Sequence, residues 1–143
     1  MSNVTKLKGF RKEVLAGCGG EVCNIFNYER FSSFTSNEHI SDLLGKVERF
    51  RVICLIKTGE AFEQMQELSK QFPKLEVRYL SGAEFDFSTE MLITGDYVFV
   101  YDGKNDLPIE NKNLAHDFMM MFELLWNRAI PCSTFQKREV NAG

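Results

Sequence analysis

Two arginines set in apolar stretches are the first candidates for chemistry in this chain. Arg51 lies in FRVICLI and Arg78 lies in LEVRYL, and both stretches have the character of β-strands. An arginine presents a planar fork of N–H donors that matches a carboxylate or a phosphate. If the two strands are neighbours, both guanidinium groups can face one anionic ligand. The alternative is that each arginine pairs across the sheet with Glu76 or Glu90.

An acidic segment follows the second of these strands. Glu84, Asp86 and Glu90 surround Phe85 and Phe87 in the sequence AEFDFSTE. Carboxylates at the ends of strands can line a ligand cleft, whereas a solvated loop is the simpler interpretation. We therefore take these three acids, with the two arginines, as candidate ligand-binding residues.

The cysteines give no pattern for a metal site. Cys18 and Cys23 lie in GCGGEVC, while Cys54 and Cys132 stand apart. Zinc sites use two closely spaced pairs, or one pair completed by histidines at a regular spacing. The two histidines are scattered, so we expect no metal, no cofactor and four free thiols. Because Cys18 and Cys23 are close on a glycine-rich turn, a redox role for them stays open.

Apolar residues along the chain alternate between the periods of helices and strands. The pattern predicts strands at 21–26, 50–56, 75–80, 91–94 and 97–101, and helices at 5–16, 38–48, 60–71 and 113–128. A Gly95-Asp96 turn joins the fourth and fifth strands, and DGKNDLPIENK is expected to be a loop. We expect an α/β fold, with residues 1–130 forming a single-domain mixed sheet flanked by helices and residues 131–143 forming a flexible tail.

Four short blocks carry a resemblance to a known family. They are Arg51–Ile56, Glu76–Leu80, Leu92–Val100 and Phe118–Trp126. Their order resembles one half of the phospholipase D fold, and is similar to the effector domain of TrmB-type transcription regulators. The resemblance implies a domain that binds a small molecule such as a sugar and regulates a partner.

The same resemblance argues against catalysis. When Asp96 is aligned with the aspartate of the phospholipase D motif, Thr89 takes the place of the catalytic histidine and Met91 that of the lysine. The family's reaction needs an imidazole to attack phosphorus and a lysine to bind phosphate oxygens. Threonine and methionine cannot take these roles, so we expect no catalytic residues and no enzymatic activity.

The last predicted helix has more apolar surface than one sheet can cover. Met119, Met120 and Met121 are consecutive, and three such positions span about 200° of a helix. At least one methionine, together with Leu124, should meet another surface, and flexible thioethers suit adaptable contacts. We name Met119, Met120 and Leu124 as interface candidates and expect a homodimer.

Composition bounds the partners and leaves two functions open. The formal net charge is -3 and the pI is near 5.5, so we do not expect nucleic acid as a partner. The N-terminus lacks the features of a signal peptide and no stretch is apolar enough to cross a membrane, so we expect a cytoplasmic protein. One hypothesis is a non-catalytic domain that senses a small-molecule ligand as a dimer. The other is a stand-alone module that binds a protein partner, such as an inhibitor from a phage or mobile element.

Overall fold

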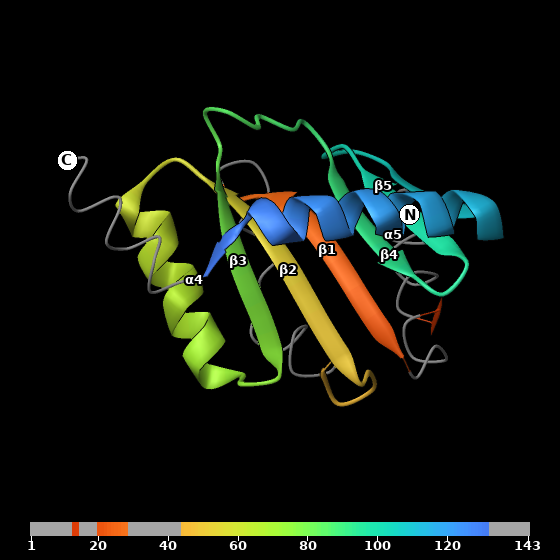
Figure 1. Cartoon of the computed structure of the whole chain (residues 1–143), viewed down its shortest axis with the longest axis horizontal. Coiled ribbons are helices and arrows are strands. Elements are labelled where there is room, and N and C mark those ends of the chain that lie inside the picture. Colours follow the sequence, from red (N-terminus) through yellow and green to blue (C-terminus); the bar gives the residue numbers. More distant parts are fainter. Residues whose placement is uncertain (1–12, 15–19, 29–43, 132–143) are drawn as a thin grey trace.

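The computed structural model describes residues 13–14, 20–28 and 44–131. Its framework is one seven-stranded sheet with the order β6-β5-β4-β1-β2-β3-β7 (Figure 1). The described strands are β1 (Glu21–Asn27), β2 (Arg49–Ile56), β3 (Leu75–Ser81), β4 (Glu90–Thr94), β5 (Tyr97–Tyr101), β6 (Asp106–Glu110) and β7 (Ile130–Pro131). The helices described in full are α4 (Gly59–Gln71) and α5 (Lys112–Arg128). The expected α/β fold is confirmed.

The centre of the sheet is parallel. β2 pairs in parallel with β1 on one side and with β3 on the other, while β4 runs antiparallel to β1. The sequence of β2 after its first residue is almost wholly apolar, and seven of its eight residues are buried. Such a continuous apolar run belongs to a strand that is covered on both faces. The predicted central position of this strand is therefore confirmed.

The predicted hairpin between β4 and β5 is present. Thr94 pairs with Tyr97 across the turn, and Gly95 has a φ of 54°. A positive φ at the first turn position is typical of a two-residue type II′ turn, which glycine adopts without strain. The backbone N–H of Asn111 donates to the carbonyl of Asp96 at 2.9 Å, which ties this turn to the residue that begins α5.

The segment DGKNDLPIENK is not a loop throughout, and that expectation is wrong. Its second half forms β6, which pairs antiparallel with β5 and places Pro108 opposite Phe99. Thr94 and Tyr97 close a two-residue hairpin, and the direction of the backbone N–H and C=O groups alternates along an antiparallel strand. The backbone groups of Phe99 therefore point toward β4. The nitrogen of Pro108, opposite Phe99, points away from β5 toward the outer side of the sheet. Proline has no N–H to donate and is tolerated at an edge of a sheet. In the described sheet, β6 is such an edge.

The two helices cover opposite faces of the sheet. Alternate residues of β2 divide between two apolar clusters: Val52 and Cys54 pack with α4, whereas Ile53 and Leu55 pack with α5. This division follows from the two-residue period of a strand. Figure 1 shows α5 crossing the strands in front of the sheet. The buried residues of α4 are Ala61, Phe62, Met65 and Leu68, and those of α5 are Ala115, Phe122 and Trp126.

Some expectations concern residues outside the described ranges. They include Cys18, Cys132, most of the helices expected at 5–16 and 38–48, and residues 132–143 of the expected tail. Residue 131 was assigned to that tail, but Pro131 pairs with Arg78 in β7.

In the described part of the chain, no helix is long and apolar enough to cross a membrane.

Candidate functional site

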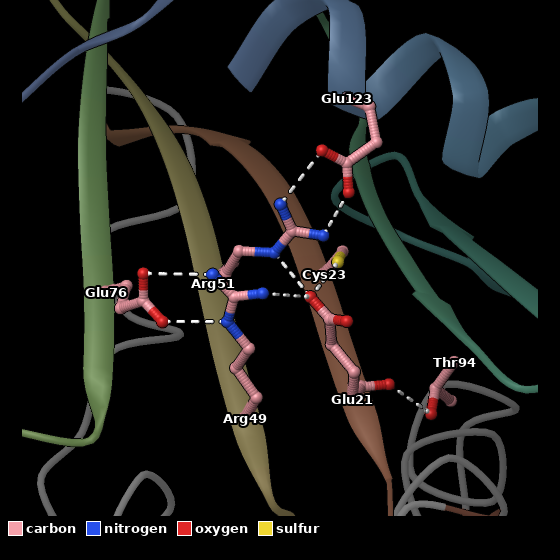
Figure 2. A network of polar contacts seen from close by, with 7 residues as sticks. All are labelled: Glu21, Cys23, Arg49, Arg51, Glu76, Thr94 and Glu123. Atoms are coloured by element: carbon pink, nitrogen blue, oxygen red, sulfur yellow. Dashed lines mark hydrogen bonds and ion pairs between the residues drawn. The ribbon is translucent and has the colours of Figure 1, made fainter. Parts of the chain in front are cut away.

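A buried arginine lies at the centre of a charged network between the sheet and α5. The side chain of Arg51, on β2, is only 4 % exposed. Its Nε donates to Glu21 on β1, and its two terminal nitrogens donate to Glu123 on α5, one of them at 3.1 Å (Figure 2). The guanidinium carbon also lies 5.1 Å from the ring centroid of Phe122 and 5.3 Å from that of Trp126. One arginine thus joins two strands and a helix.

The network continues across the sheet with alternating charge. Arg49 on β2 donates to both carboxylate oxygens of Glu76 on β3, at 2.8 and 3.3 Å, and lies 3.9 Å from Glu21 (Figure 2). Hydrogen bonding from Arg51 holds the pKa of Glu123 below its usual value, and hydrogen bonding from Arg49 does the same for Glu76. Burial alone would lower the pKa of Arg51, but hydrogen bonds to Glu123 and Glu21 hold it above its usual value. These groups therefore stay charged at neutral pH.

Cys23 lies beneath this network and is fully buried on β1. Burial raises the pKa of its thiol to about 12. Because the thiolate is the reactive form of cysteine, this side chain acts as a small core residue at neutral pH.

Arg78, the second arginine singled out from the sequence, also contacts α5. Its guanidinium lies 4.4 Å from the ring centroid of Trp126 and donates to that residue's backbone carbonyl at 2.8 Å. Arg51 and Arg78 therefore do share one neighbourhood, as expected for adjacent strands, but what they share is an aromatic ring of the protein. The alternative interpretation paired these arginines with Glu76 or Glu90. Arg51 instead bonds to Glu21 and Glu123, and Arg78 bonds to the backbone carbonyl of Trp126.

The three acidic candidates are not brought together by the fold. Glu84 and Asp86 are exposed in the segment after β3, where Asp86 accepts a hydrogen bond from Asn27 at 3.1 Å and lies 3.6 Å from Lys57. Glu90 is buried at the start of β4 and accepts a hydrogen bond from Asn24. It shares a face with Leu92, on the α4 side of the sheet. A single acidic site is therefore not formed by these residues.

Thr89 and Met91, which replace the histidine and lysine of the phospholipase D motif, are both partly buried. Thr89 precedes β4, and Met91 lies within it, opposite Ile25 of β1. Thr89 does not supply the imidazole that the motif uses as its nucleophile, and Met91 does not supply the cation that binds phosphate oxygens. The absence of enzymatic activity remains a prediction.

The outer surface of α5 carries three exposed apolar side chains among polar ones such as His116, Asp117 and Asn127. Met120, Met121 and Leu124 are 58, 50 and 69 % exposed. Two of them were expected there. Met119 was also expected at an interface, but it is partly buried and packs against the sheet. Met121 takes its place in the exposed set, because one step along a helix turns a side chain by about 100°.

Sequence reasoning missed Glu21, Arg49 and Glu123 as members of the charged network. Strand pairing gives a signal for Glu21 and Arg49, because these two residues lie opposite each other in the register of β1 and β2. In the register of β2 and β3, Arg51 lies opposite Glu76. Finding Glu123 requires the position of α5, because 72 residues separate it from Arg51.

Comparisons with known proteins support the fold. No protein-family model and no curated protein matches the sequence. The chain has the same mixed α/β architecture as one part of a solved structure, TrmBL2, described as an archaeal chromatin protein with a novel mode of DNA binding. The TM-score is 0.63 and the identity is 17 %, over 92 % of this chain and 52 % of that one. The likeness shows a shared fold with a TrmB-type protein, and this chain spans about half the length of its neighbour.

The expectation that nucleic acid is not a partner is contradicted by this comparison. A protein with this fold is described as binding DNA, so the fold occurs in a DNA-binding context. The expectation used the formal net charge of -3. Net charge describes a whole chain, whereas contact with phosphates depends on where the cations lie.

Proposed function

We propose that the chain is a non-catalytic regulatory domain that acts as a homodimer, with the outer face of α5 as the contact. The observation that carries the proposal is the cluster of Met120, Met121 and Leu124 on one helix. These positions lie within an arc of about 100°. Exposed apolar residues gathered in this way mark interaction sites, whereas single ones are ordinary.

A second copy is the partner that this surface suits best. A two-fold axis beside α5 would bring Leu124 of one copy against Met120 and Leu124 of the other. Because the contact is symmetric, the same apolar side chains would be buried in both copies. Burying one such side chain contributes about 1.5 to 3 kcal/mol. The likeness to half of a TrmB-type protein supports a regulatory role for the dimer.

Sedimentation of the purified protein tests the dimer. We expect the wild type to sediment as a dimer at tens of micromolar, and Leu124→Glu to weaken association by about tenfold or more. Gln64→Glu is the control, because it adds the same charge to the exposed side of α4, on the other face of the sheet. A monomeric wild type would contradict the proposal and would favour a protein partner on the same surface.

Ligand sensing is the finer part of this proposal. Arg51 and Arg78 are engaged with groups of the protein, which leaves Glu84 and Asp86 as the solvent-accessible members of the expected set. A thermal-shift screen of sugars and other metabolites tests this part, since a ligand of the folded state raises the melting temperature. Asp86→Asn should abolish the shift if this segment binds the ligand.

Contact with DNA is a second candidate function, which the description of TrmBL2 favours. The test is an electrophoretic mobility shift with a random-sequence duplex at low and high salt. DNA contact through phosphates weakens steeply as salt rises. A shift that persists unchanged across that range would exclude phosphate contact as its source, and no shift at low salt would remove the candidate.

A further inference from the structure

Arg51 joins β1 and β2 to one turn of α5. It hydrogen-bonds to Glu123 and lies against the rings of Phe122 and Trp126, three residues that span little more than one turn of the helix. The Nε of the same guanidinium is held by Glu21. A bidentate arginine–carboxylate pair is directional, because each of the two N–H donors must point at its own carboxylate oxygen. Movement of α5 along the sheet, or rotation about its own axis, would break this geometry.

Arg78 supplies a second point of attachment, on β3. It donates to the carbonyl of Trp126 at 2.8 Å, in the last turn of α5. Carbonyls in the last turn of a helix lack partners within the helix, and cations are favoured there. Two arginines on different strands thus hold the same end of the helix.

Apolar packing selects which side of α5 faces the sheet, but it does not by itself fix the exact rotation of the helix. Burial of Phe122 and Trp126 is favourable in proportion to the area removed from water, and it has no direction. Small rotations of α5 about its axis, or small shifts along the sheet, change this buried area only gradually. Directional bonds to charged groups are one means by which a protein selects among such packings.

We propose that Arg51, supported by Arg78, is a positioning residue that fixes the exact rotation of α5 and thereby the way in which Met120, Met121 and Leu124 are presented at the surface. Its effect on association rests on the dimer proposed above. Its effect on the helix does not, because that effect concerns the position of Trp126 within one chain.

The test compares Arg51→Met with Arg49→Met. Both substitutions remove an arginine from the same face of β2, and both break ion pairs with Glu21. Arg49 pairs with acids on β1 and β3, whereas Arg51 pairs with acids on β1 and α5. Trp126 is the only tryptophan in the chain, so its fluorescence reports the position of the helix without a label.

We expect Arg51→Met to shift the emission of Trp126 to longer wavelength, to increase its quenching by acrylamide, and to weaken association by about tenfold. Arg49→Met should leave all three unchanged. Arg51→Lys should behave like Arg51→Met, since lysine keeps the charge but lacks the fork. A lysine variant with wild-type emission and association would show that charge alone is needed, and would overturn the proposal.

The remaining outcomes also decide the matter. Unchanged Trp126 emission in a folded Arg51→Met protein overturns the proposal. If the wild type is a dimer, altered emission in a variant that dimerises as strongly as the wild type also overturns it. If the wild type is a monomer, the dimer fails, and emission alone supports or overturns the positioning of α5. If Arg51→Met does not fold by circular dichroism, Glu123→Gln replaces it, because Arg51 then keeps Glu21. Glu123→Gln should change the emission in the same direction, and no change would overturn the proposal.

Discussion

The helices α4 and α5 cover opposite faces of one sheet and differ in what they present to solvent. The exposed side of α4 carries charged and polar residues: Glu60, Glu63, Gln64, Glu67 and Lys70. The exposed side of α5 carries three apolar residues, Met120, Met121 and Leu124, among polar residues such as His116, Asp117 and Asn127. α4 meets the sheet through apolar contacts such as the Phe62–Tyr79 pair, 4.9 Å between centroids, whereas α5 adds the bonds from Arg51 and Arg78. Hydrophobicity decides which side of each helix faces inward, and α5 adds directional bonds from two arginines.

The inner faces of both helices should be essential to folding, and large-to-small substitutions test this with the largest expected effects. Phe62→Ala and Phe122→Ala should each lower the free energy of unfolding by about 3 to 5 kcal/mol, because both rings are buried. Phe122→Ala should be the more damaging, since Arg51 also lies against that ring. Urea unfolding measures both. A loss below about 1 kcal/mol for Phe122→Ala would contradict the packing of α5.

The N-caps offer a matched comparison with smaller effects. Thr58 accepts a hydrogen bond from the backbone N–H of Ala61 at 3.2 Å, and Asn111 accepts one from that of Leu114 at 3.0 Å. Replacing either cap with alanine should cost about 0.5 to 2 kcal/mol. Thermal unfolding compares the two variants. Thr58→Ser, which keeps a hydroxyl, is the control for α4, and Asn111→Asp is the control for α5.

The charged attachment of α5 predicts a difference in acid sensitivity. The pKa of Glu123 is lowered by its hydrogen bond from Arg51, from an ordinary value of 4.5. A carboxylate whose pKa is lower in the folded state stabilises the protein above pH 4.5 and loses this contribution as the pH falls through the folded pKa. The side chain is about half exposed, so the effect should not exceed about 1 kcal/mol.

Comparison of the wild type with Glu123→Gln measures that contribution. The difference in melting temperature should be present at pH 7 and should shrink as the pH falls through the lowered pKa of the wild-type carboxylate. Glu63→Gln on α4 is the control, because its carboxylate is exposed. A difference that stays constant across this range would show that Glu123 contributes through something other than its charge.

The smallest effect on folding is expected at the outer face of α5. Leu124→Gln should change the unfolding free energy of the monomer by less than about 0.5 kcal/mol, since the side chain is mostly exposed already. Measurement at concentrations below dimerisation separates folding from association. A loss as large as that of Phe122→Ala would mean that Leu124 packs within its own chain.

Local patterns were sufficient to predict the central elements of the fold. The apolar runs of β2 and β3 and the glycine in the β4–β5 turn each dictate a conformation through neighbouring residues alone. β6 was missed because Asp106 and Pro108 are poor strand formers, and the strand exists because β5 offers a free edge for pairing. Pairing of that kind cannot be found from a local window.

The candidate site was predictable only in part. The exposed position of Met120 and Leu124 follows from helical geometry, because the other side of α5 already supplies enough apolar residues for the sheet. The engagement of Arg51 was not predictable in the same way. It depends on Glu123 being brought above β2 by a helix that crosses several strands, and no periodicity in the sequence encodes that crossing.

Pro108 affects how copies of this chain can add to one another through strands. An incoming strand joins a sheet by bonding to a row of free backbone donors and acceptors, and this is the route by which fibres grow. At the β6 edge of the described sheet, the row spans five residues and lacks a donor at its middle position. The opposite described edge ends in a strand of two residues. Growth by open-ended strand addition is thereby disfavoured, whereas the proposed contact through α5 would give a closed pair that stops at two.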